Sequence, residues 1–343
     1  MATPVFTYDN PMSWAECGVT LSASTVRYSE EWMRALLSHM ARARMNVLLW
    51  EVKIARGESG AKSTTGFITS QPFVTPEEAH RIIGYARELG IAVIPEINSP
   101  GHLRTWLTHY PEFAIRDAKG ERDLERLDVL NPEAVQWYLD LADSYAEVFD
   151  SPWWHMGADE FENELDHRTY ADYPQLAAAA VERYGVGAQP WDVNMAFVNT
   201  VAEHMRRHGL KLRIWNDGLR RGGKVQLDPS IIVEYWIDKG ANYLNPCEIA
   251  AAGHDLINVP QRLYFSRSEK HIYSPNAQAI AAAGRAGLAL FDGDQVLPAE
   301  LAHKQRGIRV SLWPDRAECQ SAEDFFAEAQ DMITLVGELA GKA

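Results

Sequence analysis

Cysteine is scarce in this sequence, and its few thiols are poorly placed for pairing. The 343 residues include only Cys17, Cys247 and Cys319, an odd number with no CxxC spacing. Small secreted domains held by disulfides, and zinc ribbons, need more cysteines at closer spacing. The sequence therefore argues against both classes, and we expect the three thiols to be chemically inert.

Long apolar runs are missing, as is any excess of positive charge. No run reaches the ~18 apolar residues that a membrane-spanning helix needs. The first residues also lack the basic and apolar segments of a secretory signal. A cytoplasmic location is therefore the default expectation. The 47 acidic residues outnumber the 33 basic ones, for a formal net charge of −14. Such a field repels nucleic acids and anionic membranes, so we expect neither as a partner. The sequence leaves open whether the chain forms a homodimer.

Apolar and aromatic residues, by contrast, are plentiful. Hydrophobic residues make up 46% of the chain and aromatic ones 10%, with 11 tryptophans, so a large folded core is available. No linker rich in Pro, Gly or Ser divides the chain. Since α/β barrels commonly exceed about 250 residues undivided, residues 1–343 are expected to form a single domain.

Short apolar or β-branched runs alternate with longer helical patterns along the chain. Helix-start signals precede several of these patterns, among them Thr75-Pro76 and Asn131-Pro132. Continuous apolar strands separated by helices predict a parallel sheet covered on both faces, and eight such units predict an α/β fold of the (β/α)8 TIM-barrel type. The expected strands are 18–22, 45–52, 91–97, 153–159, 212–217, 231–236, 256–260 and 309–313. Long loops are expected after strands two and four, in 53–74 and 160–190.

Polar and aromatic residues stand at the carboxyl ends of these strands, where a barrel gathers its functional groups. They are Glu96, Asn98, His102, His155, Asp159, Glu160, Trp215, Asn216, Asp217, Glu234, Tyr235, Trp236, Tyr264, Trp313 and Asp315. Carboxylates bind hydroxyl groups, and tryptophan faces stack on the apolar faces of sugars. The set therefore predicts a small neutral carbohydrate as the ligand.

Asp159 and Glu160 are adjacent, which constrains the chemistry. An ordinary retaining glycosidase places two carboxyls ~5 Å apart across the scissile bond, and an inverting one places them further apart. Neighbours in an extended strand point to opposite sides, so this pair does not flank one bond unless the strand has already ended and the chain turns. A different division of labour suits adjacent acids: Glu160 protonates the leaving oxygen, while Asp159 holds a substrate group that itself attacks the anomeric carbon.

Two motifs carry a resemblance to a known family. The segment HMGADE at 155–160 resembles the His-x-Gly-Gly-Asp-Glu signature of family 20 glycoside hydrolases, the β-N-acetylhexosaminidases, with Ala158 in place of the second glycine. The segment PEINSPGH at 95–102 resembles that family's PEIDxPGH, with Asn98 in place of the acid. The resemblance extends from about residue 17 to 320, and it implies an exo-acting hexosaminidase on a barrel without the small domain that often precedes it.

The resemblance also implies roles for individual residues. In that family the substrate's acetamido oxygen is the nucleophile, and the intermediate is oxazolinium-like. Asp159 would hold the acetamido N–H, and Glu160, with a raised pKa, would act as general acid and then general base. The other implied substrate-binding residues are His102 and His155 behind the acids, Trp215, Trp236 and Trp313 around the sugar, Tyr264 on the acetamido oxygen, and Asp315 on the outer hydroxyls. No metal and no cofactor is implied.

The sequence departs from the family in two places. Cys17 precedes Gly18 where the family has an arginine that clamps ring hydroxyls. The run LLWEVKIARGE lacks the family's acidic motif on strand two, for which Glu51 and Glu58 are the available substitutes.

Three classes of function stay open at this stage. Besides the hexosaminidase, the sequence allows a metal-dependent barrel hydrolase that uses His102, His155, Asp159 and Glu234, and a sugar-binding barrel that has lost catalysis. More ordinary interpretations also exist: His155 lies inside a strand, as structural histidines do, and each tryptophan alone is more often a core residue than a binding one.

Overall fold

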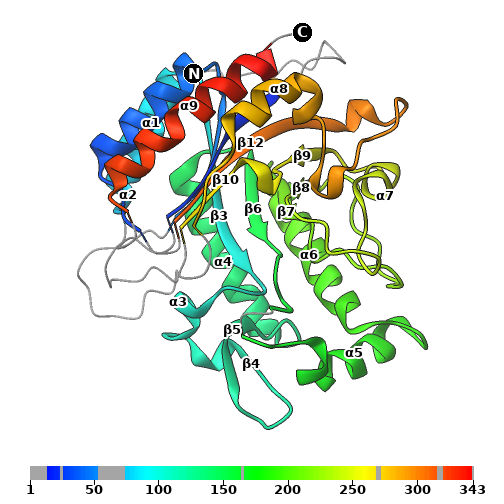
Figure 1. Ribbon diagram of the computed structural model, residues 1–343. Coiled ribbons are helices and arrows are strands. Elements are labelled where there is room, and N and C mark those ends of the chain that lie inside the picture. Colours follow the sequence, from blue (N-terminus) through cyan, green and yellow to red (C-terminus); the bar gives the residue numbers. More distant parts are fainter. Residues whose placement is uncertain are drawn as a thin grey trace.

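Eight parallel strands close into a barrel in the computed structural model, which describes residues 14–23, 26–52, 74–163, 166–267, 272–314 and 320–341 (Figure 1). The barrel strands are β1 (Glu16–Ser22), β2 (Val47–Glu51), β3 (Ala92–Ser99), β6 (Trp153–Gly157), β7 (Lys211–Trp215), β8 (Ile232–Tyr235), β9 (Leu256–Asn258) and β12 (Gln305–Pro314). The barrel closes because β1 pairs with β2 on one side and with β12 on the other. Each predicted run overlaps one of these strands, so the single-domain TIM barrel is confirmed.

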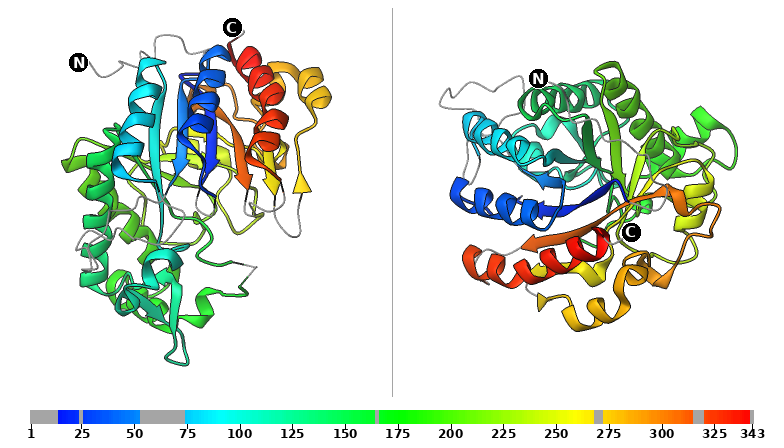
Figure 2. Two further views of the ribbon diagram at one scale, coloured as in Figure 1. Left: turned by 90° about the vertical axis from the view of Figure 1, so that its left-hand side faces the viewer. Right: turned by 90° about the horizontal axis from the view of Figure 1, so that it is seen from above.

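Helices surround the strands, as the view along the barrel shows (Figure 2). They are α1 (Glu30–Arg42), α2 (Pro76–Glu88), α4 (Pro132–Phe149), α6 (Pro190–Arg207), α7 (Pro246–Ala251), α8 (Ala277–Leu288) and α9 (Ala322–Gly341). The predicted start signals are used: the Thr75 side chain caps α2, and the Asn131 side chain caps α4. No helix separates β7 from β8, where every residue is described. This stretch contains GLRRGGKVQLDPS, whose glycines and proline disfavour a helix, so the expectation of eight complete units is wrong there.

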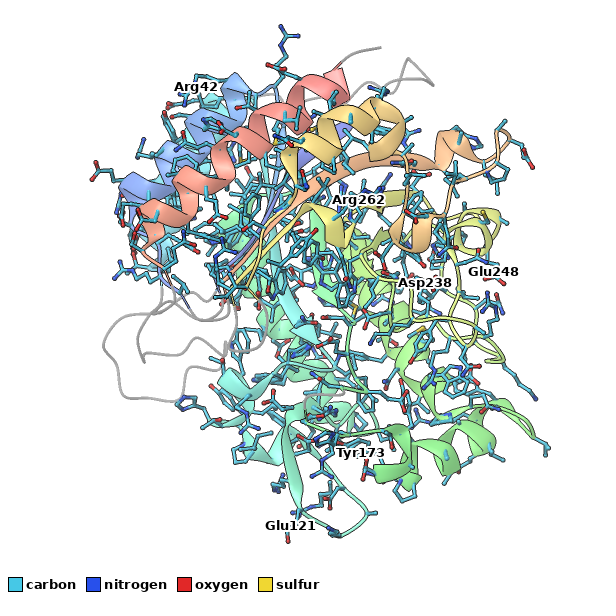
Figure 3. All side chains as sticks on the ribbon, in the orientation of Figure 1. Arg42, Glu121, Tyr173, Asp238, Glu248 and Arg262 are labelled. Atoms are coloured by element: carbon cyan, nitrogen blue, oxygen red, sulfur yellow. The ribbon has the colours of Figure 1, made fainter. Side chains whose placement is uncertain are left out.

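Two insertions extend the carboxyl end of the barrel. The first, between β3 and α4, holds α3 (Arg104–Leu107), the 3-10 turn η1 (Pro111–Phe113) and the antiparallel hairpin β4 (Ala114–Arg116) and β5 (Arg122–Leu127); the second, after β6, holds η2 (Tyr170–Asp172) and α5 (Pro174–Tyr184). The buried Arg126 guanidinium joins them, since it bonds the Asp123 and Asp166 carboxylates and the Phe161 carbonyl. Figure 3 marks Glu121 at the hairpin tip and Tyr173, whose hydroxyl bonds Asp123. Residues 53–73 of the other predicted loop lie outside the described residues.

The seventh barrel strand is interrupted. After β9 the chain makes the 3-10 turn η3 (Gln261–Leu263) and continues as β10 (Tyr264–Arg267), which pairs in parallel with the far half of β12. The two-residue β11 (Ile272–Tyr273) then pairs antiparallel with β10, and the turns η4 (Asp292–Asp294) and η5 (Ala302–Lys304) precede β12. The interruption carries Tyr264 to the carboxyl end of the barrel, beside the other strand ends.

Charged residues fill the middle of the barrel. Arg213 and Arg309 contact Glu16 and Glu234, at nitrogen-to-oxygen distances of 2.5 to 3.2 Å, and all four side chains are almost completely buried. Buried ions need balanced partners, and here two positive and two negative groups provide them. An apolar layer that includes Val47, Leu49, Ile94, Trp153 and Ile257 packs inside the same barrel. Together these layers close the barrel beneath the strand ends and support them. No described helix is both apolar and long enough to cross a membrane.

Candidate active site

The backbone turns sharply between β6 and the acidic pair. Strand β6 ends at Gly157, and Ala158 and Glu160 have φ angles of +68° and +46°. Gly157 is itself at φ +68°, and a Cβ there would lie 1.6 Å from the Asn98 Oδ1 atom, so this position requires glycine. Because the strand has ended, Asp159 and Glu160 point to the same side. This is the alternative that the sequence left open, in which the strand ends before the pair and the chain turns.

His102 contacts both acids. Its Nε2 atom lies 3.2 Å from Glu160 Oε2 and 3.7 Å from Asp159 Oδ2. Burial opposes protonation of His102, but the hydrogen bond to Glu160 and the negative charges of Asp159 and Glu160 outweigh burial and raise the pKa of His102 to about 9. At neutral pH the imidazole is therefore cationic. The sequence predicts that His102 supports the acids from behind, and the structure places its side chain, which is 34% exposed, in direct contact with both.

The two acids have opposite pKa shifts. Burial raises the pKa of Asp159 to about 7, against the His102 charge, which lowers it. Burial also tends to raise the pKa of Glu160, but the hydrogen bond and charge of His102 bring it below its usual value. The expectation of a raised Glu160 pKa is thus wrong for this arrangement, because the sequence does not show that His102 bonds Glu160 directly. In this pair the proton therefore lies on His102, and Glu160 accepts the hydrogen bond.

Asp217 fastens the acidic turn to the neighbouring strands. Its carboxylate accepts hydrogen bonds from the Glu160 backbone N–H at 3.0 Å and from the Trp236 indole at 2.9 Å, and it lies 3.2 Å from the Lys239 ammonium. The sequence places Asp217 at a strand end but gives it no role. Its spacing is the available signal: two residues after Trp215, it continues the face of β7 that points into the barrel.

Four aromatic side chains line the space beside the acids. The Tyr264 ring lies between Trp236 and Trp313, with centroid distances of 6.3 and 6.5 Å and nearly parallel planes. Trp215 packs edge-on against Trp313, is 2% exposed, and donates its indole N–H to Glu96 at 2.6 Å. Trp236, Tyr264 and Trp313 are only partly buried. These three rings are therefore accessible beside the acids, whereas Trp215 is covered.

The Tyr264 hydroxyl is held in its neutral form. Burial raises its pKa well above the usual value, and the nearby negative charges of Asp159, Glu96 and Asp217 act in the same direction. A neutral phenol donates a hydrogen bond, which is what an amide oxygen requires. The placement of Tyr264 near Asp159 is thus compatible with the role that the family resemblance implies.

His155 supports the site from below. Its Nδ1 atom accepts the Gly157 backbone N–H at 3.1 Å and lies 3.5 Å from Glu96, and its Nε2 atom lies 4.0 Å from Glu234. Burial, and then the charges of Arg309 and Arg213, hold the pKa of His155 well below its usual value. A neutral imidazole that fixes the Gly157 turn is a structural residue, in keeping with its position inside a strand.

Strands one and two clarify the departures from the family pattern. Glu51 ends β2 in register with Glu96, accepts the Ser22 hydroxyl at 2.6 Å, and its charge contributes to the raised pKa of His102. Glu51 is therefore an acid of the site, whereas Glu58 and Asp315 lie outside the described residues. Cys17 packs in the core outside the barrel, and burial raises its pKa to about 12.

A cation is missing from the inner face of strand one. Glu16 bonds Arg213 inside the barrel, so the alternation of a strand places Gly18, Thr20 and Ser22 on the same inner face. All of β1 is described, and beyond Glu16 its inner face carries only glycine and hydroxyl side chains. The arginine clamp of the family pattern has no counterpart on this strand.

The metal-binding set considered from the sequence is not assembled. One Glu234 oxygen contacts both Arg213 and Arg309, deep in the barrel, and His155 lies beside it. Within the described site, the ligand atoms that come within 4.8 Å of one another belong instead to His102, Asp159 and Glu160. The prediction of a metal site formed by His102, His155, Asp159 and Glu234 is therefore wrong. The site offers the buried Asp159 carboxylate, the hydrogen-bonded pair of His102 and Glu160, and a row of partly accessible aromatic rings.

Comparisons with known proteins agree with this geometry. Residues 18–325 match the family model described as glycosyl hydrolase family 20, catalytic domain. A lacto-N-biosidase from Bifidobacterium bifidum is 34% identical over 339 residues, which are 99% of this chain and 29% of that protein, and a beta-hexosaminidase from Porphyromonas gingivalis is 27% identical over 311 residues, which are 84% and 37%. The chain thus spans about a third of the length of these relatives. The crystal structure of dispersin B has the same fold, with a TM-score of 0.72, 19% identity and coverage of 94% and 98%.

Proposed function

The chain belongs to glycosyl hydrolase family 20, and from this premise we propose that it is an exo-acting β-N-acetylhexosaminidase that uses the acetamido group of its substrate as the nucleophile. The observation that carries the proposal is the meeting of Asp159 and Glu160 at one imidazole beside the stacked rings of Trp236, Tyr264 and Trp313. Removal of a terminal N-acetylhexosamine from a small glycoside needs one amide holder and one proton donor, and the adjacent acids supply both.

Asp159 is suited to hold the amide. Its side chain is 11% exposed, against 27% for Glu160. Its Oδ1 atom is buried without a hydrogen-bond partner among the described residues. A buried acceptor without a partner is costly, and an acetamido N–H from a sugar in the pocket would satisfy it. The bond would also orient the acetamido oxygen towards the anomeric carbon.

Glu160 is suited to move the proton. It is the more exposed acid, and its Oε2 atom accepts the Asn163 amide at 3.1 Å. In the first step the acetamido oxygen bonds the anomeric carbon, the bond to the leaving oxygen breaks, and the His102–Glu160 pair gives that oxygen its proton. In the second step Glu160 takes a proton from water, the water oxygen bonds the anomeric carbon, and the bicyclic intermediate opens to the product sugar.

Distance alone does not separate this mechanism from direct attack by Asp159. Carboxylate oxygens of the two acids lie within 4.8 Å, similar to the ~5 Å of two-carboxylate retaining enzymes. Two facts favour the substrate's own oxygen. Family 20 is a substrate-assisted exception to the two-carboxylate scheme. The Asp159 Oδ1 atom is also buried without a hydrogen-bond partner among the described residues, which suits it to accept the amide N–H.

Release of a disaccharide is a second candidate activity. The 34% identity to a lacto-N-biosidase extends over 99% of this chain, whereas two beta-hexosaminidases are 25% and 27% identical over 59% and 84% of it. The inner face of β1 carries hydroxyl groups in place of a cation, so no arginine side chain from this strand closes the pocket over the outer hydroxyls. That arrangement would leave room for a further sugar.

A panel of nitrophenyl glycosides tests both candidates. We expect the purified chain to hydrolyse the β-N-acetylglucosaminide, the β-N-acetylgalactosaminide or the β-lacto-N-bioside, and to release a product that retains the β configuration. Preference for the lacto-N-bioside would select the disaccharide activity. Tight binding of N-acetylglucosamine without turnover of any member would contradict the hydrolase and favour the sugar-binding barrel. An Asp159→Asn variant controls for contaminating activity.

The pKa shifts predict a bell-shaped pH profile for kcat/KM. Asp159 must be ionised to accept the amide N–H, so activity should rise with pH through about 7. The His102–Glu160 pair must keep its proton, so activity should fall as pH rises through about 9. In His102→Gln, Asp159 loses the cation that lowers its pKa, and the acidic limb should move to higher pH. An acidic limb that stays in place in this variant would contradict the assignment.

A further inference from the structure

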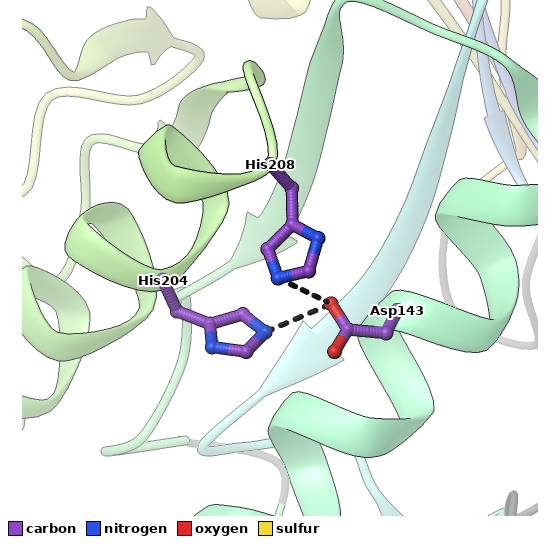
Figure 4. A group of neighbouring side chains, drawn as sticks. All are labelled: Asp143, His204 and His208. Carbon is purple, nitrogen blue, oxygen red and sulfur yellow. Dashed lines mark hydrogen bonds and ion pairs between the residues drawn. The ribbon is translucent and has the colours of Figure 1, made fainter.

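A second cluster of metal-ligating side chains lies outside the barrel. Among the described residues, two groups of three such side chains bring their ligand atoms within 4.8 Å of one another, and one of them is the catalytic group. The other consists of Asp143, His204 and His208 (Figure 4). Asp143 belongs to α4, His204 to the last turn of α6, and His208 is the residue that ends α6.

Both imidazoles converge on one carboxylate oxygen. His204 Nε2 lies 2.8 Å and His208 Nε2 lies 3.8 Å from Asp143 Oδ1, and the two rings have a centroid distance of 4.8 Å. A tetrahedral zinc ion with ligand bonds of 2.0–2.1 Å keeps its ligand atoms about 3.3 Å apart. One observed separation is slightly shorter than that value and the other slightly longer. The shorter separation is a hydrogen bond, which the ion would replace, and small rotations of the Asp143 and His208 side chains would bring the ligand atoms to the required spacing.

The two helices hold this geometry in place. Residues four apart on a helix share a face, which is why His204 and His208 project together towards α4. The separation of α4 and α6 is fixed by their packing, in which the Tyr138 and Phe197 rings meet edge to face at a centroid distance of 5.7 Å. The negative end of the α6 dipole also favours a cation there.

Neighbouring charges do not oppose a bound cation. The basic residues of the same turn, Arg206 and Arg207, are paired with the carboxylates of Asp228 and Glu203. The Asp143, His204 and His208 side chains are 31%, 16% and 50% exposed. An ion can therefore reach the cluster from solvent, and a water molecule can complete its coordination.

We propose that Asp143, His204 and His208 bind one zinc ion that fastens α4 to α6. Two imidazole nitrogens and one carboxylate oxygen suit zinc and its transition-metal neighbours, whereas magnesium and calcium require oxygen ligands. Helix α4 ends just before β6, and α6 ends just before β7. The cluster therefore lies towards the amino ends of these strands, opposite the catalytic acids. The ion has a structural role that is separate from glycoside hydrolysis.

Zinc titration of the metal-free protein tests the site. The catalytic cluster also offers three ligands, so the parent protein for this experiment is His102→Gln. After chelator treatment and gel filtration, we expect this parent to bind one zinc ion by calorimetry and by metal analysis. When His204→Gln and His208→Gln are added to this parent, zinc binding should be lost or its affinity should fall by at least about 10²-fold. Adding His80→Gln, at an exposed histidine on α2, should leave it unchanged.

Thermal unfolding provides an independent measurement. Zinc at 100 times its Kd should raise the Tm of the parent by ~4 °C and leave the Tm of the variant without His204 and His208 unchanged. Circular dichroism and the metal-free Tm establish that the variants fold, and cobalt should give the visible absorption of a tetrahedral site in the parent alone. Absence of zinc binding by the parent, or equal stoichiometry and affinity in the parent and the double-histidine variant, would overturn the proposal.

Discussion

Glu160→Gln is expected to lower kcat/KM by about 10³-fold on an N-acetylhexosaminide with a poor leaving group, because the His102–Glu160 pair then has no carboxylate through which to pass its proton. Glutamine keeps the size and the Asn163 contact but cannot transfer a proton. With a dinitrophenyl leaving group, which departs without a proton, the loss in the first step should be much smaller. The comparison of the two substrates therefore isolates proton donation from any change in folding or binding.

A matched control is available on the same face of the protein. Glu121 is an exposed acid at the tip of the β4–β5 hairpin, and Glu121→Gln should leave kcat/KM within about twofold of the parent. Steady-state kinetics on both substrates, with single-turnover measurements to separate the two steps, provide the comparison. An equal loss on both leaving groups in Glu160→Gln would show that Glu160 does not donate the proton.

The fold of this chain follows from its sequence because parallel strands buried on both faces leave a strong signal. Runs such as MNVLLWEV and IAVIPEI are apolar except for Asn46, Glu51 and Glu96, as a barrel strand covered by helices requires. The β4–β5 hairpin is much harder to predict. Its strands are short and polar, and its stability depends on Arg126, whose partners Phe161 and Asp166 are 35 and 40 residues away along the chain. Local patterns do not contain such contacts.

The site shows the same division between local and distant information. The sequence identifies Asp159 and Glu160 and places His102 near them, because strand ends meet in a barrel. It does not give the direction of the side chains, which depends on the left-handed backbone at Ala158 and Glu160. It also does not give the sign of the Glu160 pKa shift, which a hydrogen bond from another strand decides. Glu51 is a further example, because only the register of its strand with Glu96 places it in the site, and the sequence alone does not give that register.

A substrate without the acetamido group should not react, and this result has the largest expected effect. If the acetamido oxygen is the nucleophile, replacing nitrophenyl β-N-acetylglucosaminide by the corresponding β-glucoside removes the attacking atom, and kcat/KM should fall by at least about 10⁵-fold, since an intramolecular nucleophile is worth this much in effective concentration. The measurement is hydrolysis of the two glycosides at equal enzyme concentration. The Asp159→Asn background level sets the detection limit. A glucoside hydrolysed within about tenfold of the acetamido substrate would point to a nucleophile on the protein.

The same premise predicts which inhibitor the pocket prefers. N-acetylglucosamine thiazoline resembles the bicyclic intermediate, so it should bind at least about 10²-fold more tightly than N-acetylglucosamine itself. Asp159→Asn should weaken thiazoline binding, because the buried Oδ1 atom loses the negative charge with which it holds the ring nitrogen, whereas Glu160→Gln should change it little. Equal affinities for the thiazoline and the sugar, or a sugar ester trapped on Asp159 during turnover, would mean that the carboxylate attacks the anomeric carbon. The adjacent acids would then act as an ordinary retaining pair, which their common orientation towards His102 permits sterically.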